Sequence, residues 1–252
     1  MTAVFYNVFE NFGGIKMYKN YLFDLDGTLL PMDMEYFTKL YFSSLCKRFV
    51  PVLNVDSDTL VKAIWKGTGA MTKNDNSRVN KDVFWEIASA ECGMDLTPYI
   101  EQFDDYYTKE FIAAKEATAF TPFAKKSVDF IKQNGGRVIA ATNPIFPEVA
   151  TRRRLEWAGV SADDFEFVTF YENSGCCKPN LKYFEFICEK CGILPEESIM
   201  IGNDVDEDMC AEKLGFDTYL ITDTIVNREN KDFSQYKNGS FEEFYEFLQK
   251  QF

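Results

Sequence analysis

Two aspartates separated by one residue follow a short apolar run near the start of the chain. Asp24 and Asp26 belong to residues 24–29 (DLDGTL) and come directly after residues 21–23 (YLF). If that run is a buried parallel strand, the aspartates stand at its carboxyl end, where open α/β sheets bind ligands. The turn at Gly27 lets both side chains converge, so one carboxylate can act as a nucleophile and the other as a proton donor. Taken alone, the segment is also compatible with an acidic turn that caps a helix.

Polar residues that suit a phosphate and a cation follow later apolar runs. Thr142 and Asn143 come after residues 137–141, and a hydroxyl beside a free backbone N–H suits a phosphoryl oxygen. Lys178 stands at the start of a helical segment, where the ammonium and the helix dipole both favour an anion. Residues 203–208 (NDVDED) form a dense acidic run after residues 198–201, and a divalent cation relieves repulsion among so many carboxylates.

The composition narrows the chemistry. The chain has 27 Lys and Arg against 40 Asp and Glu, a net charge of −13, and no histidine. Ser-His-Asp and Cys-His catalysis, histidine general bases and His-ligated zinc are therefore excluded, and carboxylates with a hard cation such as Mg²⁺ remain. The acidic balance argues against a nucleic-acid partner. Hydrophobic residues make up 46% of the chain, enough for a sizeable core.

Short apolar runs alternate with helical segments over most of the chain. We expect buried strands at 21–23, 137–141, 165–170, 198–201 and 218–221, and helices at 122–133, 147–158, 180–191, 206–214 and from 241 onward. Gly159 and Gly192 follow two of these helices at the position that favours a left-handed residue. This alternation predicts an α/β, doubly wound (Rossmann-like) parallel sheet core.

Residues 33–116 break the alternation. Apolar and aromatic residues recur there at helical spacing, as at Phe37, Leu40 and Tyr41, and no strand-like run appears. We expect an inserted all-helical cap domain at 33–116, with the core formed by 17–32 and 117–252. A polar loop at 67–78 joins two of its helices. Lys73 and Arg78 in this loop are candidate substrate contacts, and a plain surface connection is the alternative.

The beginning of the chain and the cysteines bear on processing and compartment. Residues 1–16 are expected to be an N-terminal extension, with Met17 as a candidate true start. No apolar run is long enough for a membrane span, and seven cysteines without a secretory signal favour a reducing cytoplasm. Cys188 and Cys191 form a C-x-x-C, for which packing on a helix face is favoured over a metal or redox role. Residues 152–154 (RRR) are expected to form a solvated helix face.

These segments together resemble the haloacid dehalogenase (HAD) superfamily over residues 18 to about 250. Residues 24–29 look like its first motif, Thr142 its second, Lys178 with Pro179 its third, and Asp204 with Asp208 its acidic fourth. The order and rough spacings also match. Residues 178–202 are similar to the subfamily with a helical cap between motifs one and two, which includes phosphoglycolate phosphatases and β-phosphoglucomutases, and residues 33–116 fall at that place.

The resemblance implies a mechanism. Asp24 attacks phosphorus and forms an aspartyl-phosphate, while Asp26 protonates the leaving oxygen and later activates water. Mg²⁺ is held by Asp24, the backbone carbonyl of Asp26 and Asp204; Asp206 and Asp208 remain alternatives because Asn203 separates Gly202 from Asp204. Further implied roles are phosphate binding by Thr142, Asn143 and Lys178, and orientation of Lys178 or a metal-bound water by Asp208.

The resemblance also limits the function. The expected activity is Mg²⁺-dependent hydrolysis of a small phosphomonoester, such as a sugar phosphate, a phosphoglycolate-like acid or a nucleoside monophosphate. A phosphomutase shares all four motifs and stays open. A non-catalytic Mg²⁺- or phosphate-binding protein is disfavoured, because it has no reason to hold Asp24, Asp26, Thr142 and Lys178 together. A dehalogenase is disfavoured because halide departure does not need the proton of Asp26. The sequence predicts no oligomeric state.

Overall fold

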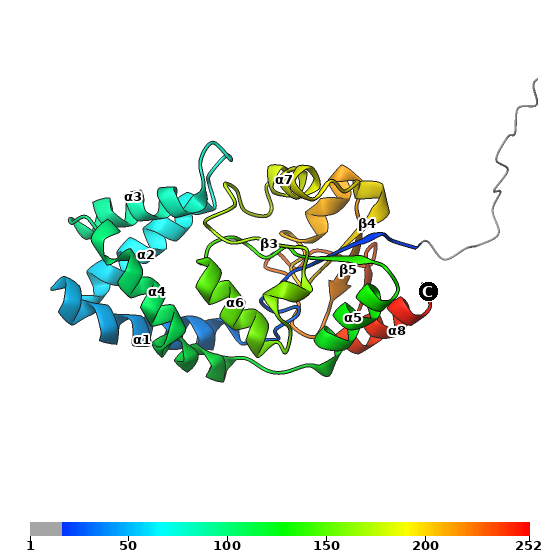
Figure 1. The fold of residues 1–252 in the computed structure, drawn as a ribbon, viewed down its shortest axis with the longest axis horizontal. Helices are drawn as coiled ribbons and strands as arrows, with labels where there is room; N and C mark the ends of the chain where they lie inside the picture. Colours follow the sequence, from blue (N-terminus) through cyan, green and yellow to red (C-terminus); the bar gives the residue numbers. More distant parts are fainter. Residues whose placement is uncertain (1–16) are drawn as a thin grey trace, which may run out of the picture.

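The computed structural model describes residues 17–252, so the predicted extension at 1–16 lies outside the described residues. Six parallel strands form one sheet in the order β3-β2-β1-β4-β5-β6 (Figure 1). The strands are β1 (Asn20–Phe23), β2 (Arg137–Ala140), β3 (Phe167–Val168), β4 (Ser198–Gly202), β5 (Asp217–Ile221) and β6 (Lys237–Gly239). The strand order reverses direction at β1, between β2 and β4, which is where doubly wound sheets bind their ligands.

Alternate strand residues pack into separate layers on the two faces of the sheet. Phe23 and Ile201 share one core cluster with Phe244 of α8, and α8 (Phe241–Gln249) contacts α5 (Pro122–Gln133). Leu22 and Met200 point into another cluster with α7 (Leu181–Cys191) and the 3₁₀ segment η5 (Met209–Leu214). Because successive side chains of a strand point to opposite faces, these short apolar runs bury both faces. The predicted α/β, doubly wound parallel fold is confirmed.

Between β1 and α5 the chain is helical, and these helices lie together at one end of the molecule (Figure 1). They are α1 (Met34–Leu53), α2 (Ser57–Met71), α3 (Asn80–Cys92), η1 (Thr97–Tyr99), α4 (Ile100–Thr108) and η2 (Glu110–Ala117), called the cap helices below. The two connections to the core run side by side, since Met32 and Thr118 form an antiparallel bridge. Aromatic packing joins the cap helices; the rings of Phe49 and Phe103 stack with centroids 3.8 Å apart.

Further helices and 3₁₀ segments connect the core strands. Helix α6 (Glu148–Trp157) contacts α4 of the cap, so it lies where core and cap meet. The 3₁₀ segments η3 (Ala162–Asp164) and η4 (Pro195–Glu197) precede β3 and β4. Gly159 and Gly192 follow α6 and α7 with φ of 80° and 61°, which is the left-handed conformation expected for these positions.

The structure differs from two predicted elements and adds a strand that was not predicted. The strand expected at 165–170 is reduced to Phe167–Val168. The helix expected at 206–214 is only the 3₁₀ segment Met209–Leu214, because the carboxylate of Asp204 accepts the backbone N–H groups of Asp206 and Glu207 and holds the chain in a turn. Strand β6 was not predicted, since Lys237 and Asn238 are exposed and give no apolar signal.

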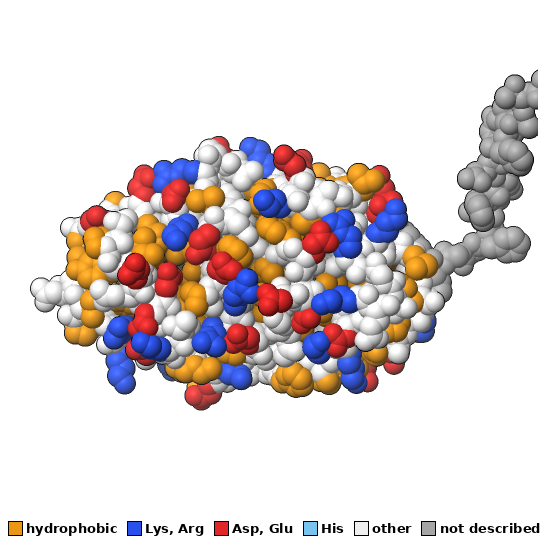
Figure 2. Space-filling model, in the orientation of Figure 1, with side chains coloured by type: hydrophobic (Ala, Val, Ile, Leu, Met, Phe, Trp, Pro, Cys, Tyr) orange, Lys and Arg blue, Asp and Glu red, His pale blue; other side chains and the backbone are white. Residues whose placement is uncertain are grey.

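The surface carries mixed charge despite the net charge of −13. On the face shown in Figure 2, basic and acidic side chains are interspersed, without a continuous basic track of the kind that nucleic acid needs. Several large apolar side chains are exposed on the cap helices, among them Met34, Val52, Trp65 and Ile112. No helix within residues 17–252 is both long and apolar enough to cross a lipid bilayer.

Candidate active site

A buried ammonium group lies between two carboxylates at the carboxyl end of the sheet. Nζ of Lys178 is 2.8 Å from Oδ1 of Asp24, which follows β1, and 2.5 Å from Oδ1 of Asp208, which precedes η5. All three residues are buried. Burial opposes the charge of Lys178, but Asp208 and Asp24 hold its pKa well above the usual lysine value. Burial raises the pKa of Asp208 to about 7, against the opposing charge of Lys178.

The loops after β1 and β4 pack closely around Asp24. The hydroxyl of Thr28 lies 3.2 Å from both Oδ2 of Asp24 and Oδ1 of Asn203. Gly27 has a φ of 87°, and a Cβ at this position would overlap the side chain of Asn203. Gly27 therefore allows both the left-handed turn and the close approach of the two loops. The motifs assign no role to Asn203, whose side-chain amide also donates to the backbone carbonyl of Thr224.

The acidic run after β4 is held by specific partners. Oδ1 of Asp204 accepts the two backbone N–H groups described above, and its Oδ2 lies 2.6 Å from Nη1 of Arg228. Oδ2 of Asp208 accepts the backbone N–H of Asp204 at 3.0 Å. Asp206 points elsewhere and pairs with Lys231. Asp204 is thus the buried carboxylate of the run that faces the loop carrying Arg228.

Thr142 and Asn143 fix the loop after β2. Thr142 is buried, and its backbone carbonyl accepts bonds from the hydroxyls of Thr169 and Tyr183. The amide of Asn143 bridges two other segments: its Oδ1 accepts the backbone N–H of Lys178 at 2.8 Å, and its Nδ2 donates to Glu207 at 2.6 Å. The side chain of Asn143 therefore ties the three loops together.

Asp26 pairs with Arg154 of α6. Nη1 of Arg154 donates to Oδ2 of Asp26, and the guanidinium carbon lies 4.3 Å from the ring centroid of Phe146. Oδ1 of Asp26 is buried without a hydrogen-bond partner among the described residues. Burial raises the pKa of Asp26, while the charge of Arg154 opposes that rise. A carboxyl group that keeps its proton more readily than usual suits a proton donor.

The predicted solvated face at 152–154 is wrong for Arg154. Arg152 and Arg153 do form exposed ion pairs, with Glu148 and Glu156, but the side chain of Arg154 is only 1% exposed. Consecutive helix residues point about 100° apart, so three in a row cannot share one face. The buried positions Ala150, Thr151, Arg154 and Leu155 follow helical spacing, and this signal places Arg154 on the inward face.

The expected metal ligands at this edge of the sheet are oxygen atoms, which Mg²⁺ prefers. No group of three or more His, Cys, Asp or Glu side chains within residues 17–252 has a metal-holding arrangement. The expected site, however, uses only two side chains, Asp24 and Asp204, with the backbone carbonyl of Asp26. Both carboxylates are buried at the ends of the neighbouring strands β1 and β4, which fits a hard cation at this edge.

Lys73 and Arg78, the candidate substrate contacts, lie on the loop between α2 and α3. Lys73 is exposed, and Arg78 forms an ion pair with Glu86 at 2.7 Å. This loop reaches the core through other residues: the backbone N–H of Asn76 donates to Gly175, and the side chain of Asn80 donates to the carbonyl of Pro144.

The C-x-x-C cysteines lie away from the carboxylate cluster. Cys188 and Cys191 are free thiols on α7, and both pack against the core cluster that α7 forms with the sheet. Burial raises the pKa of each thiol to about 11. Packing accounts for both positions.

Comparison with known proteins gave one family and many similar folds. The family profile described as haloacid dehalogenase-like hydrolase matches residues 18–215. A search of curated proteins found no match. An HAD phosphatase from Thermococcus onnurineus is 19% identical, with a TM-score of 0.58 over 92% of this chain and 99% of the other.

Two further solved structures share the fold. The HAD-hydrolase YfnB of Bacillus subtilis, bound to magnesium, is 19% identical, with a TM-score of 0.52 over 92% of this chain and 99% of the other. A 2-haloacid dehalogenase from Pseudomonas syringae is 17% identical, with a TM-score of 0.58 over 93% and 99%. At these identities the likeness establishes the fold.

Proposed function

Because the chain belongs to the haloacid dehalogenase-like hydrolase family, we propose that it is a Mg²⁺-dependent phosphatase acting on a small phosphomonoester. The observation that carries this proposal is the contact between Lys178 and Asp24 at the carboxyl end of β1. A buried cation beside a candidate nucleophile attracts the phosphate dianion to the carboxylate that must attack it. The phosphatase among the similar folds supports the same reaction class.

In this proposal Asp24 attacks phosphorus in line and forms an aspartyl-phosphate. Asp26 gives its proton to the leaving oxygen and then accepts one from the water that hydrolyses the intermediate. The raised pKa of Asp26 supports the first of these steps, because its carboxyl group must be protonated to donate. A dehalogenase does not need this proton, so Asp26 favours phosphoryl transfer.

The remaining residues bind and orient. Lys178 and Thr142 hold the oxygens of the transferring group, and Asp208 holds Lys178 in place. Asn143 fixes the backbone of Lys178 and leaves its own backbone N–H for phosphate. Asp24, Asp204 and the carbonyl of Asp26 would hold Mg²⁺, whose charge offsets the repulsion between carboxylate and phosphate. Asp206 is less suited because its side chain is 29% exposed, against 8% for Asp204.

We place the protein in the cytoplasm, with a small phosphorylated molecule as its substrate. All seven cysteines are free thiols, as expected of a protein in a reducing compartment. The cap helices lie beside the carboxylate cluster, and a site covered in this way favours small substrates over phosphoproteins.

The test is release of phosphate from p-nitrophenyl phosphate in the presence of Mg²⁺. We expect Asp24→Asn to abolish release while circular dichroism and the melting temperature stay near those of the wild type, because asparagine has the size of aspartate and Asp208 still pairs with Lys178. Chelation of Mg²⁺ should have the same effect. Asp163→Asn, at a carboxylate whose side chain is 86% exposed, is the matched control and should remain active. Activity that survives Asp24→Asn or chelation contradicts the mechanism, and an isomeric phosphate ester in place of free phosphate would identify a mutase.

A further inference from the structure

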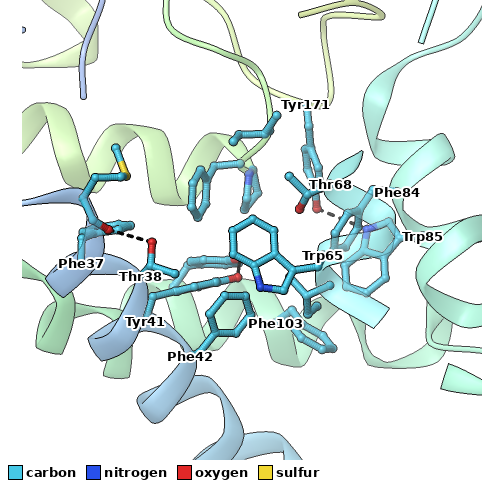
Figure 3. A pocket seen from close by; sticks show the side chains of 16 residues that line it. Phe37, Thr38, Tyr41, Phe42, Trp65, Thr68, Phe84, Trp85, Phe103 and Tyr171 are labelled. Carbon is cyan, nitrogen blue, oxygen red and sulfur yellow. Dashed lines mark hydrogen bonds between the residues drawn. The ribbon is translucent and has the colours of Figure 1, made fainter. Parts of the chain in front are cut away.

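An aromatic cavity lies between the cap helices and the core. It has a volume of about 120 Å³, and none of the 16 residues that line it carries a charge (Figure 3). Side chains of α1, α2, α3 and α4 form most of the wall, and residues 145–147 with Tyr171 of the core complete it. Trp65 and Met34 line the cavity and are 53% and 52% exposed, so it opens to solvent on their side.

Most polar groups in the wall are already bonded to protein. The hydroxyls of Tyr41 and Tyr107 lie 2.9 Å apart, and Nε1 of Trp85 donates to the hydroxyl of Tyr171 at 3.3 Å (Figure 3). The hydroxyl of Thr38 donates to a backbone carbonyl of its own helix. A ligand with hydroxyl or carboxylate groups would lose its water here and find few partners, whereas an apolar ligand loses nothing.

The cavity adjoins the carboxylate cluster through Phe146. This ring lines the cavity and also lies over the guanidinium of Arg154, which binds Asp26. Residues 145–147 directly follow Thr142, Asn143 and Pro144, which form the loop after β2. The aromatic cavity is therefore the apolar space that lies beyond Phe146 and Arg154 from Asp26, the residue expected at the leaving oxygen.

We propose that the substrate is a phosphomonoester whose alcohol carries an uncharged apolar group of about the size of a benzene ring. This inference rests on the proposed function and narrows its substrate class. A cavity of about 150 Å³ lined by Leu, Ile and Phe is large enough to hold benzene, so a space of similar size suits a single ring or a short branched chain. Sugar phosphates and phosphoglycolate-like acids are disfavoured, because their hydroxyls or carboxylate would meet an aromatic wall.

The first experiment compares three substrates of the wild-type enzyme with Mg²⁺: benzyl phosphate, 4-carboxybenzyl phosphate and methyl phosphate. We expect kcat/KM for benzyl phosphate to exceed that for each of the others by at least about tenfold, since an apolar pocket discriminates by that order for each group it accepts or rejects. The carboxybenzyl ester differs from the benzyl ester by a single charged group. Equal values for these two esters would overturn the proposal.

The second experiment places a charge in the wall. Thr68 lines the cavity from α2, and the test variant is Thr68→Asp. The matched control is Thr72→Asp, at an exposed threonine at the end of the same helix. We expect Thr68→Asp to lower the ratio of kcat/KM for benzyl over methyl phosphate at least about tenfold, mainly through KM, and Thr72→Asp to leave the ratio within about twofold. An equal ratio in the two variants would overturn the proposal.

The two proposals can fail separately. If the wild type releases phosphate neither from the three esters nor from p-nitrophenyl phosphate, the proposed phosphatase function itself is wrong. If it hydrolyses methyl phosphate or p-nitrophenyl phosphate without preferring benzyl over 4-carboxybenzyl phosphate, the phosphatase function stands and only the apolar substrate class is rejected.

Discussion

The ammonium of Lys178 compensates two carboxylates that are buried with it. Removing one partner of a buried ionic group leaves uncompensated charge and destabilises a protein by about 3–5 kcal/mol. We expect Lys178→Met to lower the free energy of unfolding by this amount near neutral pH, because Asp24 and Asp208 would then repel each other. Urea denaturation measures the loss. Lys182→Met, at an exposed lysine four residues further on, is the control and should change stability by less than about 0.5 kcal/mol.

The pH dependence of that loss follows from the two pKa shifts. The pKa of Lys178 lies above its usual value, so the contribution of this lysine is fully present below the usual lysine pKa and is lost only as pH rises through the folded-state value. In the variant, burial without the ammonium raises the pKa of Asp208 further, so the folded state gains a proton and stability as pH falls. The difference from wild type should therefore be smaller at about pH 5 than at about pH 9. An equal difference at both would contradict this assignment.

Arg154 opposes the rise that burial causes in the pKa of Asp26. A neighbouring guanidinium lowers the pKa of an aspartate by about 1–3 pH units. Arg154→Met removes that charge while burial remains, so the pKa of Asp26 should rise and the alkaline limb of the kcat profile should move to higher pH by that order. Arg153→Met, at the exposed neighbour on the same helix, should leave the profile in place. An unmoved limb in Arg154→Met would show that Asp26 is not the proton donor.

At the level of elements, the buried strands could be predicted most directly from the sequence. Runs such as 21–23 and 198–201 are apolar on both faces because helices cover both faces of the sheet. Strand β6 has one buried residue and gives no such signal. The spacing of the acidic run after β4 predicts a helix. The side chain of Asp204 instead accepts the backbone N–H of Asp206, and the chain forms a turn.

Once the strands are predicted, the residues at their carboxyl ends can be predicted to lie close together. In a parallel sheet the loops after β1, β2, β3 and β4 meet at one edge, and this brings Asp24 after β1 within 2.8 Å of Lys178, which follows β3. The residues that α6 and the cap helices bring next to these loops could not be predicted from motif spacing. Arg154 and the aromatic wall of the cavity depend on how α6 and the cap helices rotate against the core, which is decided by tertiary packing.

Gly202 at the end of β4 is an element-level constraint on the site. A Cβ there would overlap the carboxylate of Asp208, so Gly202→Ala should displace Asp208 from the backbone N–H of Asp204. Overpacking of this kind destabilises by about 1–3 kcal/mol, measured by urea denaturation, and phosphate release should fall as Lys178 loses its support. Gly69→Ala in α2 is the matched control: nothing lies within 4 Å of its Cβ, and it should stabilise by about 0.4–1 kcal/mol. Equal effects of the two substitutions would rule out this account.

At the scale of the molecule, the cap loop is bonded to the same core segments that carry the site. The backbone N–H groups of Asn76 and Asn80 donate to Gly175 and Ser174, shortly before Lys178 in the chain. The side chain of Asn80 is fully buried and donates to the carbonyl of Pro144, next to Asn143. Asn80 therefore links the cap to the loops that we propose bind phosphate.

We expect Asn80→Ala to loosen both the cap and the loop after β2. The carbonyl of Pro144 would stay buried without its partner, which destabilises by about 1–3 kcal/mol, and amide hydrogen exchange of residues 143–147 should become faster. Phosphate release should fall with it, because Asn143 no longer holds the backbone of Lys178 as firmly. Asn238→Ala, at an exposed asparagine on β6, is the control and should alter neither exchange nor activity. If Asn80→Ala destabilises the protein but leaves exchange at 143–147 unchanged, then the cap is not coupled to the site through Asn80, and the loop after β2 is held by the core alone.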